Sequence, residues 1–233
     1  MSPSPRFLTP ICPPLENGDQ LTRSEFEQRY DATPQLTKAE LIEGTVYMPA
    51  ALRYQSHGKP HSYILGWLAT YEAETPNVGL ADNATIRLDI NNELQPDALL
   101  RIETGGQSTV SEDDHVEGAP ELIVEIAAST TSIDLNQKLQ VYCRNRVQEY
   151  LVWRVYDQEF DWFRSINDQY IKAKVDETGI ICSQVFPGLW LDSKALLAGN
   201  RAQVLKTVQL GMASVEHQLF IDRLLNLQKP NNG

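Results

Sequence analysis

ELIVEIAASTTSIDLNQKLQVY, residues 121–142, decides the fold, because a strand pattern in it gives way to a helix pattern. Residues 122–127 are apolar on both alternating faces except for Glu125, which predicts a central strand covered on both sides. Further on, Leu135, Lys138 and Tyr142 recur at helical spacing, so Lys138 lies inside an apolar stripe. A charge inside an apolar element is costly unless it is paired or binds a metal. The unit therefore predicts a strand followed by a helix, and a site between them.

The segments on either side of this unit predict the elements that surround it. Ser24 and Glu27 have capping-box spacing for a helix that begins near Leu21. We expect a hairpin of residues 39–42 and 45–48, a helix over 61–74, strands over 84–90 and 95–102, and a mobile surface loop over 103–118. Strands near 149–155, 160–165, 170–174 and 180–183 read as an antiparallel meander, and a short helix follows over 192–197. These elements predict an α/β (α+β) fold with a central mixed β-sheet flanked by helices.

The two ends of the chain differ in composition from the part between them. Residues 1–20 are rich in proline and predict a flexible N-terminal arm, and residues 21–198 predict one folded domain. From Asn200 onward the chain predicts one long helix with Val204, Val208, Val215 and Leu219 on one face. We interpret this extension, residues 199–233, as a possible oligomerisation element of a homo-oligomer, with a dimer as the expected form.

The composition bounds the class of protein. No apolar run approaches the roughly 18–20 residues that a membrane span requires, so we expect no membrane partner. The chain has three widely spaced cysteines, Cys12, Cys143 and Cys182, which predict neither a zinc site nor a disulfide framework and favour a cytoplasmic location. The net charge of −11 counts against a large sequence-independent DNA-binding surface. It does not exclude a local basic groove, or metal ions that neutralise phosphate at the site.

Two carboxylates and one ammonium carry the candidate chemistry. Asp97 follows Pro96, and because proline lacks a backbone donor this position is predicted to lie at the beginning of a strand. Asp97 and Glu125 at one end of a sheet, with Lys138 nearby, are the parts of a metal-dependent phosphodiesterase that uses Mg²⁺ or Mn²⁺. Two simpler interpretations stay open: Glu125 in a structural ion pair, and Lys138 with its tip extended to solvent.

Several short motifs resemble one known family in their order and spacing. They are Glu40-Leu-Ile-Glu-Gly44, His61, Pro96-Asp97, Glu125 with Ser129-Thr130, Asp134, Lys138, Tyr142, Glu149-Tyr-Leu-Val-Trp153 and Phe186-Pro-Gly-Leu-Trp-Leu191. Together they resemble the Uma2 family, restriction-endonuclease-like proteins that are widespread in bacteria and abundant in cyanobacteria. The resemblance covers roughly residues 22–198. It implies a restriction-endonuclease-like core, the PD-(D/E)xK nuclease fold.

The resemblance also implies roles for individual residues. Asp97 and Glu125 would be the metal ligands, and Glu40 would be an accessory acidic residue near the metal. The wider superfamily carries its lysine two residues after the second acid, where this chain has Ala127. Lys138 would then supply the ammonium from the helix.

Two further residues have less specific roles in this interpretation. His61 would sit near the site or at the mouth through which substrate enters, or it would simply be a polar residue at the start of a helix. Tyr142, one helical turn after Lys138, would hydrogen-bond near the site or pack in the core. Both are candidates for substrate binding.

Three functions are compatible with these residues. The first is a Mg²⁺-dependent endonuclease that hydrolyses DNA phosphodiester bonds, in which Lys138 orients the water or stabilises the transition state. The second is a non-catalytic nucleic-acid-binding or regulatory protein that keeps the nuclease fold, and the third is an assembly module. The net negative charge of the chain favours the last two. The nuclease is favoured by the predicted cluster of charged residues, Glu40, Asp97, Glu125 and Lys138, since burying charges costs free energy and a non-catalytic protein gains nothing from them. The nuclease prediction requires the nitrogen of Lys138 to point at Glu125.

Overall fold

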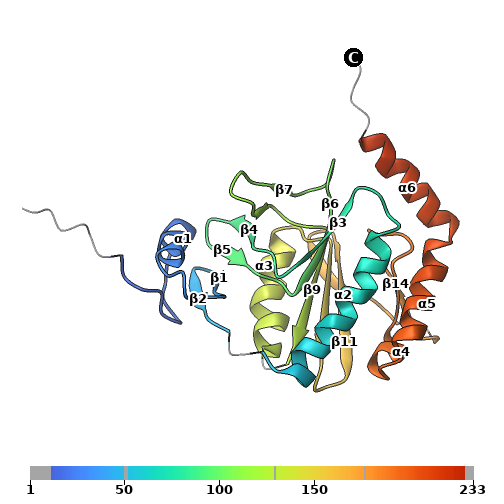
Figure 1. The fold of residues 1–233 in the computed structure, drawn as a ribbon, viewed down its shortest axis with the longest axis horizontal. Helices are drawn as coiled ribbons and strands as arrows, with labels where there is room; N and C mark the ends of the chain where they lie inside the picture. Colours follow the sequence, from blue (N-terminus) through green and yellow to red (C-terminus); the bar gives the residue numbers. More distant parts are fainter. Residues whose placement is uncertain (1–11, 50–51, 129, 176, 229–233) are drawn as a thin grey trace, which may run out of the picture.

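A mixed six-stranded sheet forms the centre of the molecule. The computed structural model describes residues 12–49, 52–128, 130–175 and 177–228. The strands lie in the order β12-β11-β10-β9-β6-β3, with bounds β3 Val78–Asp82, β6 Ala98–Ile102, β9 Leu122–Ala127, β10 Glu149–Arg154, β11 Glu159–Ile166 and β12 Gln169–Lys172. Only the β9–β10 pair is parallel in this sheet. Helices lie on both sides of it (Figure 1), so the predicted fold class is confirmed.

Strand β9 is buried along its whole length, as its apolar pattern predicts. Val124 and Ile126 face one core cluster, which includes residues of the helix α2, Lys59–Glu72. Ile123 and Ala127 face the other, which includes Tyr142 of the following helix. A strand covered on both faces gains burial for every side chain, and only Glu125 requires a polar partner there.

The helix after β9 begins with a wide turn. It consists of the π-helix η2, Ile133–Lys138, which continues into the α-helix α3, Leu139–Arg144. The chain then returns as β10, parallel to β9. The predicted strand–helix–strand crossover is therefore present, and Lys138 ends its first turn.

A second, smaller sheet packs beside the central one. Its strands lie in the order β2-β1-β5-β4-β8-β7, with bounds β1 Glu40–Ile42, β2 Thr45–Tyr47, β4 Ile86–Asp89, β5 Asn92–Leu94, β7 Thr109–Val110 and β8 Val116–Glu117. The predicted β1–β2 hairpin is confirmed, and its turn residues Glu43 and Gly44 have φ angles of 53° and 74°, which a type I′ turn requires.

Two predictions in this region need correction, and one strand was missed. The strand predicted over 95–102 is present in the central sheet as β6, but it begins only at Ala98, after Pro96, which cannot donate to a ladder. The loop predicted over 103–118 contains the short hairpin β7–β8. Strand β3 was not predicted, since its sequence VGLAD has no clear alternation of apolar and polar residues.

Two helices in the first part of the chain support these sheets. Helix α1, Arg23–Asp31, begins with a capping box of Thr22 and Glu25, so the predicted box of Ser24 and Glu27 was wrong by two residues. Helix α2, Lys59–Glu72, is preceded by a π-helical turn, η1, Tyr54–Gly58. It packs along one face of the central sheet (Figure 1).

The C-terminal part folds back onto the same face of the sheet as α2. It contains a two-stranded sheet of β13, Ile180–Cys182, and β14, Trp190–Asp192, and the helices α4, Ser193–Leu197, α5, Arg201–Met212, and α6, Val215–Leu227. Strand β13 therefore leaves the predicted meander and pairs with β14, whereas β10, β11 and β12 follow the meander as predicted. The predicted helix over 192–197 is confirmed by α4.

The single long C-terminal helix was a wrong prediction. It breaks after Met212, because the Ser214 side chain caps a new helix by accepting a hydrogen bond from the backbone N–H of His217. Val204 and Val208 are buried, but Val215 is 71% exposed, so the predicted continuous apolar face does not exist. The role of this extension in a homodimer stays a prediction.

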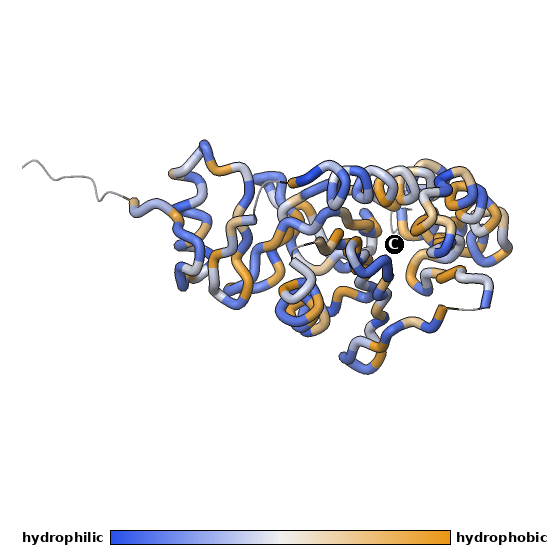
Figure 2. The backbone as a smooth tube through the Cα atoms, turned by 90° about the horizontal axis from the view of Figure 1, so that it is seen from below, coloured by the Kyte–Doolittle hydropathy of each residue, from blue (hydrophilic) through white to orange (hydrophobic). Residues whose placement is uncertain are grey.

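Along the described residues, hydrophobic positions are interspersed with hydrophilic ones rather than forming one long run (Figure 2). Within the residues that the structure describes, no helix combines the length and the apolar character of a membrane span.

Substitutions in α6 test whether the C-terminal helices are part of the domain core. Leu224 is fully buried, whereas Leu219 in the same helix is 63% exposed. Leu224→Ala should lower the free energy of unfolding by about 2–5 kcal/mol, because it leaves a cavity in the core. Leu219→Ala, the matched control, should change it by no more than about 0.5 kcal/mol. Urea unfolding measures both, and equal effects would show that α6 does not pack as described.

Candidate active site

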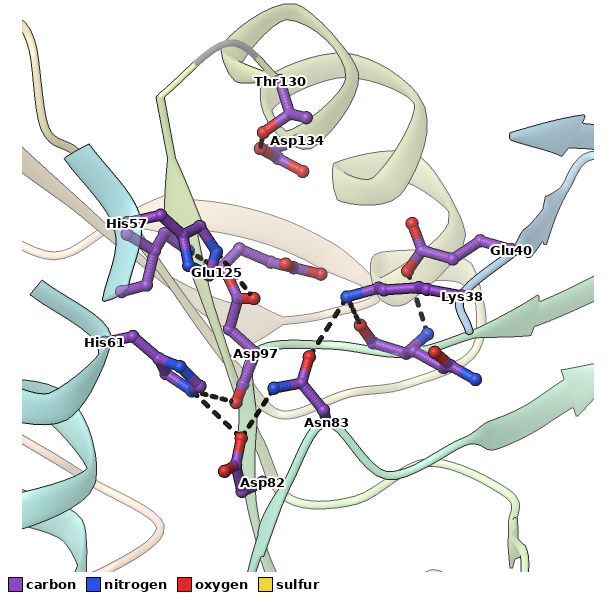
Figure 3. Close-up of polar contacts among 12 residues, drawn as sticks. Lys38, Glu40, His57, His61, Asp82, Asn83, Asp97, Glu125, Thr130 and Asp134 are labelled. Carbon is purple, nitrogen blue, oxygen red and sulfur yellow. Dashed lines mark hydrogen bonds and ion pairs between the residues drawn. The ribbon is translucent and has the colours of Figure 1, made fainter. Parts of the chain in front are cut away.

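Strand pairing brings the two predicted acids together. Ala98 of β6 lies opposite Val124 of β9 in an antiparallel pair. Asp97, which precedes Ala98, therefore lies opposite Glu125, which follows Val124. Asp97 Oδ2 accepts a hydrogen bond of 2.7 Å from the backbone N–H of Ile126. Figure 3 shows both carboxylates at the same end of the sheet, and both residues are buried.

Lys138 joins this pair from the crossover helix. Its Nζ atom lies 2.8 Å from Glu125 Oε1 and 3.0 Å from Glu40 Oε1. It also lies 3.8 Å from Asp134 Oδ1. Its side chain is only 6% exposed, which contradicts an extension of the tip to solvent. The predicted direction of the nitrogen toward Glu125 is confirmed.

Glu40 connects the small sheet to the site. One oxygen, Oε1, accepts hydrogen bonds both from Lys138 Nζ, at 3.0 Å, and from the backbone N–H of Gln95, at 2.9 Å. Gln95 precedes Pro96 and Asp97, where the chain passes from the small sheet to the central one. Glu40 therefore fixes the crossover lysine relative to the segment that carries Asp97.

Asp134 is a fourth buried carboxylate at the site. It lies in η2, and the Thr130 hydroxyl donates a hydrogen bond of 2.6 Å to its Oδ2. Its other oxygen faces Lys138. Figure 3 shows Asp134 on the helix side of the site, with Asp97 and Glu125 on the sheet side.

Tyr142 lies behind Glu125, in the core. Its hydroxyl donates a hydrogen bond of 3.0 Å to Glu125 Oε1, and its side chain is fully buried. Its ring lies edge-on to Tyr150. Of the two roles predicted for Tyr142, the hydrogen bond and the packing, the structure has both.

His61 contacts the backbone of Asp97 rather than its carboxylate. Its Nε2 atom lies 2.7 Å from the carbonyl oxygen of Asp97 and 3.2 Å from Asp82 Oδ1. A carbonyl oxygen can only accept a hydrogen bond, so Nε2 carries the hydrogen and donates the hydrogen bond to this oxygen. His61 thus holds the strand end that carries the acid (Figure 3).

His57 is a site residue that the sequence analysis did not identify. Its Nε2 atom lies 3.0 Å from Asp97 Oδ1, and its Nδ1 atom is buried without a hydrogen-bond partner among the described residues. The available signal was its spacing of four residues before His61 on the same helical run, since residues four apart share a helix face.

Lys38 is a second site residue that was missed. Its Nζ atom donates hydrogen bonds to the carbonyl oxygen of Gln95, at 2.8 Å, and to Asn83 Oδ1, at 3.2 Å. It reaches the site from the segment before β1 (Figure 3). The available signal was its position two residues before Glu40, on the same face of an extended chain.

Burial and neighbouring charges separate the pKa values of the two central acids. Burial raises the pKa of Glu125 to about 8, with Lys138 opposing this and Asp97 adding to it. For Asp97, burial acts in the same direction, but the hydrogen bond and charge of His57, with the charge of Lys38, lower its pKa below the ordinary value. Without a further cation, Asp97 is therefore ionised at neutral pH and Glu125 retains a proton.

The remaining groups show the same competition. Burial disfavours the charged form of Lys138, but Glu125, Glu40 and Asp134 outweigh it and raise its pKa well above the ordinary value. Burial raises the pKa of Asp134, with Lys138 opposing it. One fully buried ammonium thus serves three nearby carboxylates, and the cluster carries more acid groups than it can ionise at low energetic cost.

This donor set fits a hard divalent cation. Mg²⁺ is commonly held by one or two carboxylates together with water and substrate phosphates, rather than by a closed cage of protein ligands. Asp97 and Glu125 supply two such carboxylates, and the crowded acids around them would lose their mutual repulsion beside a cation. Among the described residues, no group of three or more His, Cys, Asp or Glu side chains is arranged to hold a metal ion, so Asp97 and Glu125 would need water and substrate oxygens as the further ligands.

The comparisons with known proteins agree with the predicted resemblance. The model of the Uma2 family, described as "Putative restriction endonuclease", matches residues 23–194. A crystal structure of "a putative nuclease belonging to DUF820" from Anabaena variabilis superposes with a TM-score of 0.54 and 12% sequence identity, covering 72% of this chain and 96% of that one. At this identity the structural likeness shows a shared fold alone. No curated protein matches the chain.

The raised pKa of Glu125 predicts a dependence of stability on pH. Its pKa is about 8 in the folded chain and about 4.3 when unfolded, so the native state keeps a proton that the unfolded state releases. The free energy of unfolding should therefore fall as pH rises from about 5 to 8 in metal-free buffer. In Glu125→Gln this fall should be smaller, by on the order of 2 kcal/mol over the window.

Urea unfolding at several pH values measures this difference. Glu112→Gln is the matched control, because Glu112 is exposed and its substitution should leave the pH dependence unchanged. Parallel curves for wild type and Glu125→Gln would contradict the pKa that we assign to the buried acid.

Proposed function

Because this chain belongs to the Uma2 family, we propose that it is a metal-dependent endonuclease that hydrolyses phosphodiester bonds of DNA. One observation carries the proposal: Asp97 and Glu125 lie opposite one another at a sheet end, and the ammonium of Lys138 lies 2.8 Å from Glu125. Acids with separated pKa values next to a cation are typical of catalytic sites.

Asp97 and Glu125 would hold Mg²⁺ or Mn²⁺. Such an ion supplies Lewis-acid polarisation of the phosphoryl oxygen and makes a nucleophile available at neutral pH. Oxygen ligands are the type that both ions prefer. The family description, a restriction endonuclease, and the description of the structural neighbour, a nuclease, agree with this chemistry.

The protein's own groups keep these two acids in fixed positions. Asp97 is held through both oxygens, by the backbone N–H of Ile126 and by His57. Among the described residues, Lys138 and Tyr142 hold Glu125, and both do so through Oε1. These contacts leave Oε2 of Glu125 for a water or an ion. Hydrogen bonds of this kind hold the reacting groups in a fixed orientation, which can supply a large part of a rate enhancement.

Lys138 then acts through Glu125. Its ion-pair contacts are to three carboxylates. We therefore propose that it orients Glu125, and with it the attacking water, rather than stabilising the charge of the phosphoryl group in the transition state. Glu40 shares the same ammonium and binds the Gln95 N–H. We therefore propose that Glu40 positions Lys138 relative to Asp97.

A non-catalytic nucleic-acid-binding, assembly or regulatory protein with the same fold is the alternative, and the net charge of −11 is the observation that favours it. An acidic protein repels phosphate over most of its surface. However, four buried carboxylates, Glu40, Asp97, Glu125 and Asp134, are costly to maintain, and a protein that only binds DNA gains nothing from them.

Plasmid cleavage in Mg²⁺ or Mn²⁺ tests the catalytic proposal. Asp97→Asn and Glu125→Gln should each lower the cleavage rate by at least a hundredfold, since each removes a charged ligand of the metal. Asp222→Asn is the matched control for a carboxylate that is exposed, on α6, and it should cleave like wild type. Equal cleavage by Asp97→Asn and wild type would sink the assignment of the site, and no cleavage of DNA or RNA by wild type would favour the alternative.

Thermal unfolding tests metal binding separately from activity. Mg²⁺ that binds only the folded state should stabilise wild type by about 2.7 kcal/mol at a concentration of one hundred times Kd. The Tm of Asp97→Asn should change little over the same Mg²⁺ series, while Asp222→Asn should respond like wild type. A shift that persists in Asp97→Asn would place the ion elsewhere in the molecule.

A further inference from the structure

Two lysines reach the candidate site, and they differ in the partners that hold them. Lys138 comes from the crossover helix and Lys38 from the segment before β1. Both can donate three hydrogen bonds through the ammonium group. The sequence analysis identified only Lys138, because only that lysine interrupts an apolar stripe.

Lys138 is already fully engaged. Three carboxylates, those of Glu40, Glu125 and Asp134, lie within 3.8 Å of its Nζ atom, and its side chain is buried. To contact a substrate phosphate it would have to leave buried carboxylates without a partner, which is strongly unfavourable. Its geometry suits a residue that positions Glu125.

Lys38 is held in a different manner. Its two hydrogen bonds go to neutral acceptors, the carbonyl oxygen of Gln95 and the amide oxygen of Asn83. These bonds orient the ammonium without neutralising its charge, and within the residues that the structure describes one of its three donors has no hydrogen-bond partner. In the described part of the chain, no carboxylate oxygen lies within the 4.0 Å of an ion pair with Lys38, and its side chain is only half-buried.

The ammonium group of Lys38 points toward the two acids of the candidate site. Figure 3 shows its nitrogen directed toward the space beside Asp97 and Glu125. Gln95 lies two residues before Asp97, so the hydrogen bond to its carbonyl fixes the lysine relative to the acid.

We propose that Lys38 binds a non-bridging oxygen of the substrate phosphodiester, whereas Lys138 positions Glu125. This inference rests on the proposed function and names the residue that meets the substrate anion. An ammonium with an unused donor and no carboxylate partner can form a charge-assisted hydrogen bond to phosphate.

The salt dependence of DNA binding tests this assignment. A lysine that contacts phosphate releases a counterion from the duplex, so its loss reduces the slope of log K against log salt concentration by about 0.9. We expect this reduction in Lys38→Gln, with an affinity about tenfold lower at low salt and the same loss for duplexes of different sequence. Fluorescence anisotropy with a short labelled duplex in EDTA gives the slope, and the salt dependence of kcat/KM in Mg²⁺ gives it independently.

Three variants keep the result interpretable. Lys206→Gln removes an exposed lysine on α5 and should leave affinity and slope unchanged. Lys38→Arg keeps the charge and should keep the slope, and Lys138→Gln should lower kcat without reducing the slope. Thermal unfolding of each variant checks that the protein is folded.

The possible results separate this inference from the proposal on which it rests. If wild type neither binds nor cleaves DNA by either readout, the proposed function fails and the role of Lys38 fails with it. If wild type cleaves DNA and Lys38→Gln keeps the wild-type slope and affinity, Lys38 does not contact phosphate while the nuclease proposal stands. A reduced slope in Lys138→Gln instead of Lys38→Gln would reverse the assignment of the two lysines.

Discussion

The hydrogen bond from the Lys138 ammonium to Glu125 is the interaction on which the site depends. It joins the crossover helix to β9, a strand buried along its whole length, at 2.8 Å, and it makes a carboxyl group at that position tolerable. Removing one partner of a buried pair typically costs 3–5 kcal/mol, because the other charge is left uncompensated. Here the loss of Lys138 would affect Glu40 and Asp134 as well as Glu125, since all three face the same nitrogen.

The passage of the chain from the small sheet to the central one supplies the other half of the site. Strand β5 ends at Leu94 and β6 begins at Ala98, and Pro96 between them cannot take part in either ladder. Glu40, Lys38 and His61 bind the backbone of this short connection. Asp97 is therefore placed by the junction of two sheets, and a rigid junction positions a side chain more accurately than a free loop does.

The parts of this arrangement that could be predicted are those that a local pattern encodes. The strand, the helix and the odd positions of Glu125 and Lys138 lie within twenty-two residues, so periodicity alone reveals them. Lys38 and His57 could not be assigned, because their partners Gln95 and Asp97 are forty or more residues away and only the sheet junction brings them close. The break in the C-terminal helix was missed because Ser214 is compatible with a helix interior as well as with a cap.

The acidic character of the whole chain and an anionic substrate can be reconciled by where the charges lie. The net charge of −11 limits non-specific binding along the duplex, because that binding depends on many lysine and arginine contacts to phosphate. Positive charge is needed only where a phosphate meets Asp97 and Glu125. In the proposed site Lys38 and a divalent cation would supply it, while Lys138 is occupied by carboxylates. An acidic enzyme built in this way would bind DNA more tightly when its metal is bound, so part of its affinity for substrate would follow the occupancy of the site rather than the charge of its surface.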